Sequence, residues 1–262
     1  MPGMKLARRV AIVTGGGRGL GRVIALGLAA EGAAVAVSGT QRPPLEATAA
    51  DIVARGGRAL ALVADVADEV AVARMVTSTV AHFERLDILV NNAGITGPTA
   101  AVIDTSAAEW ERTLAVNLTG AFLCAKHAIP HLVASEHGRI INITSIAGQI
   151  GYALRSPYAA SKWGMIGLTR SLALEVGPRG VTVNAIAPGS TRGERLANVV
   201  RDRAAVLGKT AEEVEREFFV SASALGRLVE PEEIAAAAVF LASDEARNIT
   251  GETLTVSAGF RL

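Results

Sequence analysis

Cysteine and histidine are scarce in this sequence, which has one cysteine and four histidines among its 262 residues. A single cysteine, Cys124, excludes an intrachain disulfide, so we expect a reducing compartment and a cytoplasmic protein. Its apolar neighbours and the lack of a nearby acid–base partner argue against a catalytic thiol. His127 and His131 lie one helical turn apart, but the sequence shows no third ligand beside them. We therefore expect no metal site.

Charge of one sign and long apolar runs are also missing. Lysine and arginine number 26 against 25 acidic residues, which gives a net charge of +1, and the arginines are scattered. Nucleic acids and anionic membranes bind concentrated basic patches, so we expect neither as a partner. No apolar stretch approaches the roughly 18 residues of a membrane span. Half of the residues are nevertheless apolar, which is enough to bury a sizeable core.

Seven short, nearly continuous apolar runs alternate with longer helical stretches. Such runs are typical of parallel strands that are buried on both faces. The alternation predicts an α/β fold with a doubly wound, seven-stranded parallel sheet, helices on both faces and one domain over residues 1–262. The predicted strands are Arg9–Thr14, Ala34–Ser38, Arg58–Ala64, Asp87–Asn91, Gly138–Thr144, Val181–Ile186 and Thr253–Ser257.

The stretch from Arg192 to Leu228 breaks this alternation. It is charged and helical, and it is too long for a plain crossover between strands. Ligands of parallel sheets bind at the carboxyl ends of the strands, and this stretch follows one of those ends. We therefore expect residues 190–228 to form a helical lid over a substrate.

A glycine-rich turn, VTGGGRGLG from Val13 to Gly21, joins the first predicted strand to the first helix. Gly15, Gly19 and Gly21 allow a tight turn, and the N-terminus of the following helix can then face a pyrophosphate. A glycine turn alone is weak evidence, because it also occurs as a purely structural turn. Its place between a strand and a helix favours dinucleotide binding.

Three more motifs follow the glycine turn in order: NNAG at 91–94, Ser145, and YAASK at 158–162. Together the four motifs resemble the short-chain dehydrogenase/reductase family, and the resemblance extends over essentially the whole chain. It implies a Rossmann fold and an NAD(P)-dependent oxidoreductase that acts on a small alcohol or ketone. It also implies a homotetramer.

Tyr158 and Lys162 are four residues apart, so they share one helix face and their side chains can converge. A nearby ammonium stabilises a phenolate, which suits Tyr158 to proton transfer. Ser145, at the end of a strand, is placed to polarise a substrate carbonyl. The resemblance implies these catalytic roles, with Lys162 also holding the nicotinamide ribose and Asn117 completing a proton relay through water. The alternatives are a capping aromatic, a surface lysine, a strand-end serine and an asparagine that bonds backbone.

The resemblance further implies cofactor contacts at several strand ends. Asp65 would bond the adenine amino group, with a helix N-cap as its alternative role. The NNAG backbone would pass the adenosine ribose, although asparagine and glycine also favour plain turns. Pro188 and Gly189 would approach the nicotinamide, with Thr191 near its carboxamide. The expected cofactor-binding residues are Gly15, Arg18, Gly19, Leu20, Gly21, Thr40, Arg42, Asp65, Val66, Asn91, Ala93, Gly94, Tyr158, Lys162, Pro188, Gly189 and Thr191.

The end of the second strand bears on the choice of nicotinamide cofactor. An acidic residue there would bond the ribose 2′-hydroxyl and repel a 2′-phosphate. This chain has Gly39 and Thr40 at that place, and Arg18 and Arg42 are positioned to pair with a phosphate instead. We therefore expect NADP(H) in preference to NAD(H).

Residues between Ser145 and Tyr158 are expected to line the substrate pocket together with arginines of the lid. Arg155, with Arg192 and Arg195 of the lid, favours a polar or anionic substrate such as a sugar, a polyol or a hydroxy acid. Alternatively, these arginines pair with glutamates of the lid. The expected substrate-binding residues are Ser145, Gln149, Arg155, Tyr158 and Arg192.

Two other functions fit the same sequence. A 3-oxoacyl-[acyl-carrier-protein] reductase is the main enzymatic alternative to an enzyme of small polar substrates. A non-catalytic nucleotide-sensing protein on the same fold is the alternative from another class, because fold alone does not fix function. Such a sensor could discard Tyr158 or Lys162, and this chain retains both.

Overall fold

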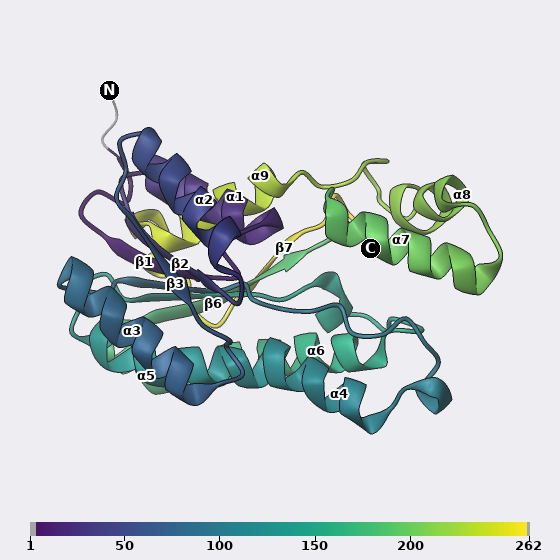
Figure 1. Cartoon of the computed structure of the whole chain (residues 1–262), viewed down its shortest axis with the longest axis horizontal. Helices are drawn as coiled ribbons and strands as arrows, with labels where there is room; N and C mark the ends of the chain where they lie inside the picture. Colours follow the sequence, from purple (N-terminus) through teal and green to yellow (C-terminus); the bar gives the residue numbers. More distant parts are fainter. Residues whose placement is uncertain (1–3, 261–262) are drawn as a thin grey trace.

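The computed structural model describes residues 4–260, and its centre is a seven-stranded parallel sheet in the order β3-β2-β1-β4-β5-β6-β7 (Figure 1). Each predicted strand is present, with ends within two residues of those expected, so the doubly wound fold is confirmed. The strands are β1 Val10–Thr14, β2 Ala34–Gly39, β3 Ala59–Val63, β4 Ile88–Asn91, β5 Arg139–Ile143, β6 Thr182–Pro188 and β7 Thr253–Val256.

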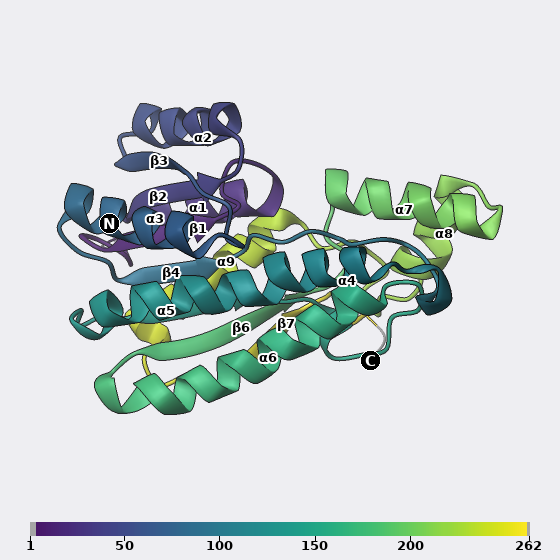
Figure 2. The ribbon, with the colours of Figure 1, turned by 60° about the horizontal axis from the view of Figure 1, so that its bottom comes forward.

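Helices cover both faces of the sheet (Figures 1 and 2). On one face α1, α2 and α9 pack against β1 and β2 through a core that includes Ile24, Leu28 and Ile234. On the other face α3, α5 and α6 form a second core around Met75, Cys124 and Leu172. The helices are α1 Gly19–Ala30, α2 Arg42–Ala54, α3 Glu69–Phe83, α5 Gly120–Val133, α6 Ser156–Val176 and α9 Pro231–Ala242.

The strands differ in burial according to their place in the sheet. Every residue of β1, β5 and β6 is buried, as the apolar runs predict. The runs that form β3 and β7 are only half-buried or exposed, so the expectation of burial on both faces is wrong for them. The physical reason is that both strands lie at an edge of the sheet, where one side has no neighbouring strand.

The crossover from β4 to β5 holds two helices rather than one. A short 3₁₀ turn, Val102–Asp104, leads to α4 Ala107–Leu114, which starts at a capping box of Ser106 and Glu109. A π-helical turn, Ala115–Thr119, then joins α4 directly to α5. Three other 3₁₀ turns lie at Ile146–Gly148, Gly177–Arg179 and Asp244–Ala246.

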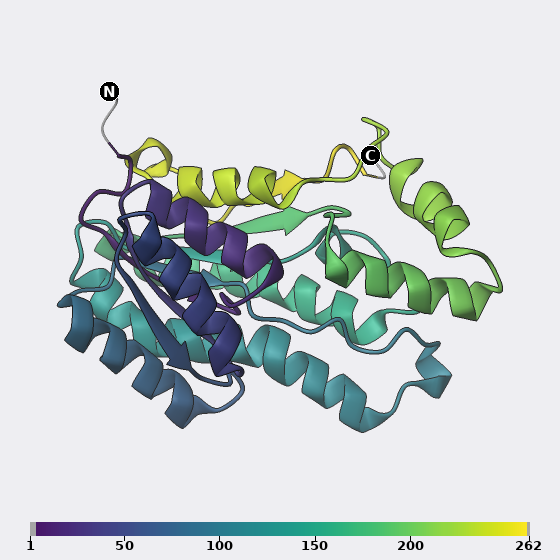
Figure 3. The same cartoon turned by 45° about the horizontal axis from the view of Figure 1, so that its top comes forward.

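The stretch after β6 projects beyond the sheet as a helical unit (Figure 3). It contains α7 Glu194–Leu207, α8 Ala211–Glu215 and a π-helical turn at Arg216–Val220. Val200, Val214, Phe219 and Leu228 form a small apolar core of its own. Within residues 4–260, no helix is both long and apolar enough to cross a membrane.

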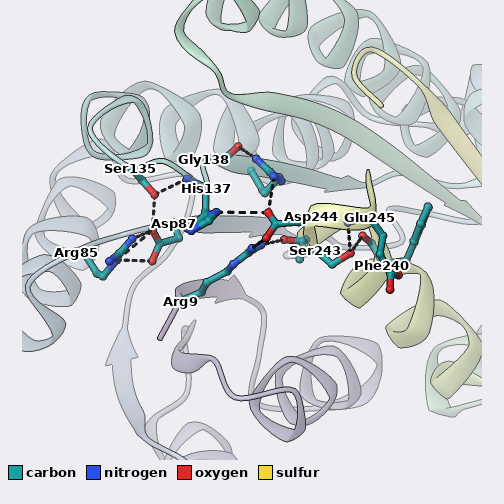
Figure 4. Close-up of polar contacts among 12 residues, drawn as sticks. Arg9, Arg85, Asp87, Ser135, His137, Gly138, Phe240, Ser243, Asp244 and Glu245 are labelled. Carbon is teal, nitrogen blue, oxygen red and sulfur yellow. Dashed lines mark hydrogen bonds and ion pairs between the residues drawn. The ribbon is translucent and has the colours of Figure 1, made fainter. Parts of the chain in front are cut away.

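An ionic network connects the amino-terminal ends of the central strands β1 and β5 (Figure 4). Asp87 is completely buried and accepts hydrogen bonds from the Val10 N–H at 2.8 Å and from Arg85. Arg9 and Arg139 are 4% and 3% exposed, and both reach Asp244, at 2.7 and 3.4 Å. The network therefore ties the first strand, the fifth strand and the end of α9 together.

Candidate active site

The loops that follow β1 and β4 are locked together at the carboxyl edge of the sheet. The Thr14 hydroxyl accepts hydrogen bonds from the N–H groups of Asn92 and Ala93, both at 3.0 Å. The Asn92 amide donates to the Thr14 carbonyl at 2.8 Å. Sequence reasoning did not assign a role to Thr14 or Asn92. The sequence feature that could have indicated them is a polar residue at the carboxyl end of each of two apolar runs, which form the neighbouring strands β1 and β4.

The start of α1 has the features of a phosphate site. α1 begins at Gly19, whose φ of 51° is in the left-handed region that favours glycine. Within the described part of the chain, no side chain caps this helix and its first turn holds no acidic residue, so its first N–H groups are free to bind an anion. A Cβ added at Gly19 would meet no atom within 4 Å, so a ligand can approach the backbone closely. These residues fit the pyrophosphate of a nicotinamide dinucleotide.

The expected adenine contact, Asp65, lies beyond the end of β3. It does not cap α3, because Asp68 accepts hydrogen bonds from the first turn of that helix. The alternative role of Asp65 as an N-cap is therefore wrong. The hydrogen bond from the Ala67 N–H lowers the pKa of Asp65. Burial raises this pKa by a smaller amount, and Arg112, at 3.0 Å, lowers it further. The carboxylate is thus ionised and positioned, and Val66 beside it is buried.

The end of β2 carries no acidic side chain. Gly39 ends the strand and Thr40 follows it in an exposed position. Arg42 lies 3.5 Å from Glu46, one turn along α2, and is 65% exposed. Arg18 is exposed and has no ion pair within residues 4–260. Both arginines are therefore exposed to a ligand that binds near the end of β2.

Tyr158 and Lys162 lie on the first two turns of α6, as their spacing predicts. The Lys162 ammonium is 5.7 Å from the centre of the Tyr158 ring and donates a hydrogen bond to the Ile143 carbonyl at 2.8 Å. Lys162 is only 2% exposed, so the alternative of a surface lysine is wrong. Burial, followed by the charge of Arg195, lowers the pKa of Lys162 to about 7.

Ser145 follows β5 and lies at the start of the 3₁₀ turn Ile146–Gly148. Its hydroxyl oxygen accepts a hydrogen bond from the Ala147 N–H at 3.2 Å. The hydroxyl proton has no acceptor among the described residues, so it remains available to a substrate oxygen. The strand-end role and the catalytic role are compatible.

Asn117 lies in the π-helical turn and is completely buried. Its side-chain oxygen accepts from the Ile95 N–H at 2.8 Å, and its amide donates to the Ile95 carbonyl at 2.9 Å and to Ser161 at 3.0 Å. The side chain therefore bonds backbone, as the alternative interpretation has it, and fixes the loop after β4 beside the start of α6. Its part in a proton relay stays a prediction.

The backbone after β6 approaches β7 closely. The Gly189 N–H donates to the Val256 carbonyl at 2.9 Å, and a Cβ at Gly189 would lie 2.6 Å from the Ser257 Cα. Only glycine fits there, so Pro188 and Gly189 form a fixed end to the strand. The Thr191 hydroxyl turns back to the Gly189 carbonyl at 3.1 Å.

Three of the expected substrate residues have protein partners. Arg192 pairs with Glu230 at 2.9 Å, which favours the alternative that this arginine binds a glutamate, one that lies just beyond the lid. Gln149 pairs with Thr255 of β7 at 3.1 Å. Arg155 is 3% exposed and donates to the Thr99 hydroxyl at 3.1 Å and to the Thr96 carbonyl at 2.8 Å, and its contact with substrate stays a prediction.

Arg195, which lies on the first turn of α7, reaches the loop that follows β4. It donates a hydrogen bond to the Gly94 carbonyl, at the end of the NNAG motif, at 2.6 Å. A Cβ at Gly94 would lie 3.1 Å from the Asn117 oxygen and 3.7 Å from the Lys162 ammonium. α7, the loop after β4 and α6 therefore meet at this point.

Thiol and metal chemistry have no support in the described residues. Burial raises the pKa of the Cys124 thiol to about 12, so the thiolate needed for nucleophilic attack does not form. His127 contacts Glu69 at 3.2 Å. Over residues 4–260, no group of three or more histidine, cysteine, aspartate or glutamate side chains is arranged to hold a metal ion.

Comparison with known proteins agrees with this geometry. A family model described as enoyl-(acyl carrier protein) reductase matches residues 15–261. The chain is 39% identical over 256 residues to (2S)-[(R)-hydroxy(phenyl)methyl]succinyl-CoA dehydrogenase subunit BbsD of Thauera aromatica, with 98% of each chain covered. It is 40% identical to a 3-oxoacyl-[acyl-carrier-protein] reductase of Synechocystis, with 97% of each chain covered.

Solved structures give the same result. A levodione reductase superposes with a TM-score of 0.92 at 35% sequence identity, covering 97% of this chain and 98% of the other. An NAD⁺-bound xylitol dehydrogenase superposes with a TM-score of 0.90 at 32% identity, covering 97% and 100%. The chain therefore belongs to the short-chain dehydrogenase/reductase family and is an NAD(P)-dependent oxidoreductase of alcohol or ketone groups.

Proposed function

We propose that the protein interconverts a secondary alcohol and a ketone on a small polar substrate, with NADP(H) as the cofactor and Tyr158 as the acid/base. The observation that carries this proposal is the convergence of Tyr158 and the buried Lys162 beside the end of β5. The bound nicotinamide supplies hydride transfer. Tyr158 exchanges the proton of the substrate oxygen, and the free hydroxyl proton of Ser145 bonds the same oxygen. Lys162 holds the cofactor ribose and stabilises the phenolate.

The preference for NADP(H) is supported by the end of β2. Gly39 and the exposed Thr40 offer no carboxylate to the ribose 2′-hydroxyl. Arg18 and Arg42 are exposed on the loops around this end and are available to pair with a 2′-phosphate. The xylitol dehydrogenase relative is described as NAD⁺-bound, so similarity to relatives alone does not favour NADP(H). The proposed preference therefore rests on Gly39, Thr40, Arg18 and Arg42 of this chain.

A small polar substrate is supported by the lid and by the relatives. The helices of residues 190–228 project beside the carboxyl ends of the strands (Figure 3). Arg195 of α7 donates a hydrogen bond to the Gly94 carbonyl in the loop that follows β4. Relatives named for levodione and xylitol act on small oxygenated molecules, as their names state. The lid is proposed to enclose such a substrate beside Ser145 and Tyr158.

A 3-oxoacyl-[acyl-carrier-protein] reductase is the second candidate, because the Synechocystis relative carries that name. A nucleotide sensor is disfavoured, since a protein that only binds a nucleotide does not need Ser145, Tyr158 and Lys162 together. A homotetramer is also proposed. The exposed apolar side chains of Phe122 on α5 and of Trp163 and Leu174 on α6 are consistent with subunit contacts.

The test is a set of initial rates on the wild-type protein and on Tyr158→Phe. NADP⁺ and NAD⁺ are each offered with xylitol, sorbitol, 3-hydroxybutyrate and cyclohexanol, and acetoacetyl-coenzyme A is offered with NADPH. We expect turnover of at least one polyol or hydroxy acid, and a loss of about a hundredfold or more in Tyr158→Phe. NADPH binding, followed by fluorescence, serves as the control and stays close to wild type in the variant.

Each part of the proposal has its own contradicting result. Turnover retained by Tyr158→Phe would exclude the acid/base role. Rapid reduction of acetoacetyl-coenzyme A with no polyol or hydroxy-acid activity would favour the acyl reductase. An NADH dissociation constant equal to or lower than that of NADPH would reject the cofactor preference.

A further inference from the structure

Arg155 is a buried cation beside the catalytic tyrosine. It directly precedes α6 and is 3% exposed. Its guanidinium donates to the Thr99 hydroxyl at 3.1 Å and to the Thr96 carbonyl at 2.8 Å, and its Nε has no hydrogen-bond partner. Among the residues that the structure describes, no carboxylate lies within ion-pair distance of it. The guanidinium carbon instead lies 5.4 Å from the centre of the Tyr158 ring.

A buried guanidinium without a counter-ion is costly, and burial lowers the pKa of Arg155 for that reason. Arg139 provides a contrast, because it is equally buried but lies 3.4 Å from the carboxylate of Asp244. The face of an aromatic ring attracts a cation only modestly, by about 0.5–2 kcal/mol. A negative charge on the Tyr158 oxygen would compensate Arg155 much better than the neutral phenol does.

Arg155 also fixes the chain around Tyr158. Its two hydrogen bonds reach the loop after β4, and the Ala100 N–H donates to the Leu154 carbonyl at 3.0 Å. Leu154 has a φ of 65°, an unfavourable conformation for a non-glycine residue that surrounding contacts must hold. The start of α6 is thus clamped to the same loop that Asn117 holds at Ile95.

The cationic groups around Tyr158 act in the same direction as Arg155, and one exposed carboxylate acts against them. Lys162 approaches the ring from within α6, and Arg195 contributes a second positive charge from α7. Asp202, also on α7, is exposed and acts on Arg155 only through its charge. Tyr152 interacts electrostatically with Arg155 as well. Arg155 and Lys162 are both buried and both face the Tyr158 ring, Lys162 from within α6 and Arg155 from the residue that precedes it.

We propose that Arg155 is a positioning residue for Tyr158, which holds the ring in place and stabilises its phenolate while the substrate proton is transferred. The proposal rests on the proposed acid/base role of Tyr158. During alcohol oxidation the phenolate takes the hydroxyl proton, and in the reverse direction the phenol returns it. The fixed positive charge of Arg155 favours the phenolate in both directions.

The test uses the fact that the chain has only two tyrosines, Tyr152 and Tyr158. The near-ultraviolet absorbance of tyrosinate is titrated in the cofactor-free protein. Because Tyr152 also interacts with Arg155, the curve subtracted from each protein is that of the same protein carrying Tyr158→Phe, which isolates Tyr158. In Arg155→Gln we expect the midpoint of this ionisation to move up by about one pH unit. Arg155→Lys, which keeps the charge, returns the midpoint toward wild type.

Arg139→Gln is the matched control, because it removes an equally buried arginine at the opposite edge of the sheet. We expect it to lower thermal stability without moving the Tyr158 midpoint. Circular dichroism at each pH confirms that the variants remain folded during the titration. Coincident midpoints in wild type and Arg155→Gln would overturn the proposal, as would a shift of the same size in Arg139→Gln.

A kinetic measurement separates this inference from the proposed function. With xylitol and NADP⁺, or with 3-hydroxybutyrate if xylitol is not oxidised, Arg155→Gln should lose about tenfold in kcat at neutral pH and recover at higher pH. An equal loss at every pH would overturn the role of the charge. Wild-type protein that turns over none of the substrates contradicts the proposed function, whereas the spectroscopic titration still decides the effect of Arg155 on Tyr158.

Discussion

At the scale of one residue, the buried charge of Lys162 lowers the stability of the folded protein. The side chain is 2% exposed and its hydrogen bond is to a neutral carbonyl, so no carboxylate compensates its charge. Burial and Arg195 lower its pKa to about 7 from 10.5. Between these two values the unfolded chain binds a proton that the folded protein lacks. The free energy of unfolding therefore rises with pH across this window and is lowest below it.

Lys162→Met should consequently stabilise the cofactor-free protein while abolishing turnover. The gain in free energy of unfolding is largest below pH 7, where wild type buries a full charge, and it shrinks by about 1.4 kcal/mol for each pH unit above that value. Urea unfolding of both proteins at pH 6.5 and pH 9.5, on the order of three units apart, measures the difference. A gain that does not change with pH would contradict the lowered pKa.

The same scale shows what the sequence leaves open in the site. Tyr158 and Lys162 were predictable because four residues of helix bring two side chains together. Arg155, only three residues upstream of Tyr158, was expected to line the substrate pocket, but its hydrogen bonds to Thr96 and Thr99 of a different crossover were not predicted. Spacing within one element predicts contacts within that element. It does not predict which distant loop satisfies a guanidinium.

At the scale of elements, the strands were predictable and their neighbours were not. Each apolar run forms a strand, since such runs bury well in a parallel sheet. The exposure of β3 and β7 follows from the strand order, which no single run encodes. The β4–β5 crossover likewise holds both α4 and α5, joined by a π-helical turn that places Asn117. The sequence therefore predicts elements better than their junctions.

The glycine loop allows a sharp test at this scale. A Cβ at Gly21 would lie 2.2 Å from the Gly15 carbonyl oxygen and 2.4 Å from the Asn92 amide, both in the loops that are locked together after β1 and β4. Gly21→Ala should therefore lower the free energy of unfolding by about 1–3 kcal/mol and weaken NADPH binding. Calorimetry and NADPH fluorescence measure the two effects.

Gly167→Ala is the control for that substitution. Gly167 lies inside α6, and a Cβ there would meet no atom within 4 Å. This variant should gain roughly 0.5–1 kcal/mol from helix propensity and bind NADPH as wild type does. If Gly21→Ala behaved like Gly167→Ala, the close approach of the β1 and β4 loops would be refuted.

At the scale of the whole molecule, the carboxyl ends and the amino ends of the strands hold different kinds of charged group. Here the carboxyl edge means the first set of ends, and the opposite edge means the second. The carboxyl edge holds the glycine loop, Tyr158 and the lid, and it includes a buried lysine and a buried arginine without counter-ions. The opposite edge holds Arg9 and Arg139 against Asp244, where each buried charge has a carboxylate (Figure 4). This separation means that the stability of the fold and the chemistry of the site can be changed independently.

Asp244→Asn tests that separation, because it leaves Arg9 and Arg139 buried without a counter-ion. Burial opposes ionisation of Asp244, but its bond with Arg9 and the charges of Arg9, His137 and Arg139 outweigh this and hold the pKa of the carboxyl below 3.8. The stabilisation is therefore present above that pH and is lost as the pH falls through the lowered value. At neutral pH we expect a loss of about 1–3 kcal/mol in the free energy of unfolding, moderated by the half-exposed carboxylate.

In strong acid the wild-type carboxyl is protonated, so the variant and the wild type should have the same free energy of unfolding there. The kcat of Asp244→Asn should stay at the wild-type value. Urea unfolding at neutral and acid pH, combined with initial rates, measures both. Glu245→Gln is the matched control, since Glu245 pairs with Lys5 and both side chains are well exposed, so its effect should lie within about 0.5 kcal/mol. A loss of kcat in Asp244→Asn at unchanged folded fraction would show instead that the ionic edge is coupled to the active site through the strands that join them.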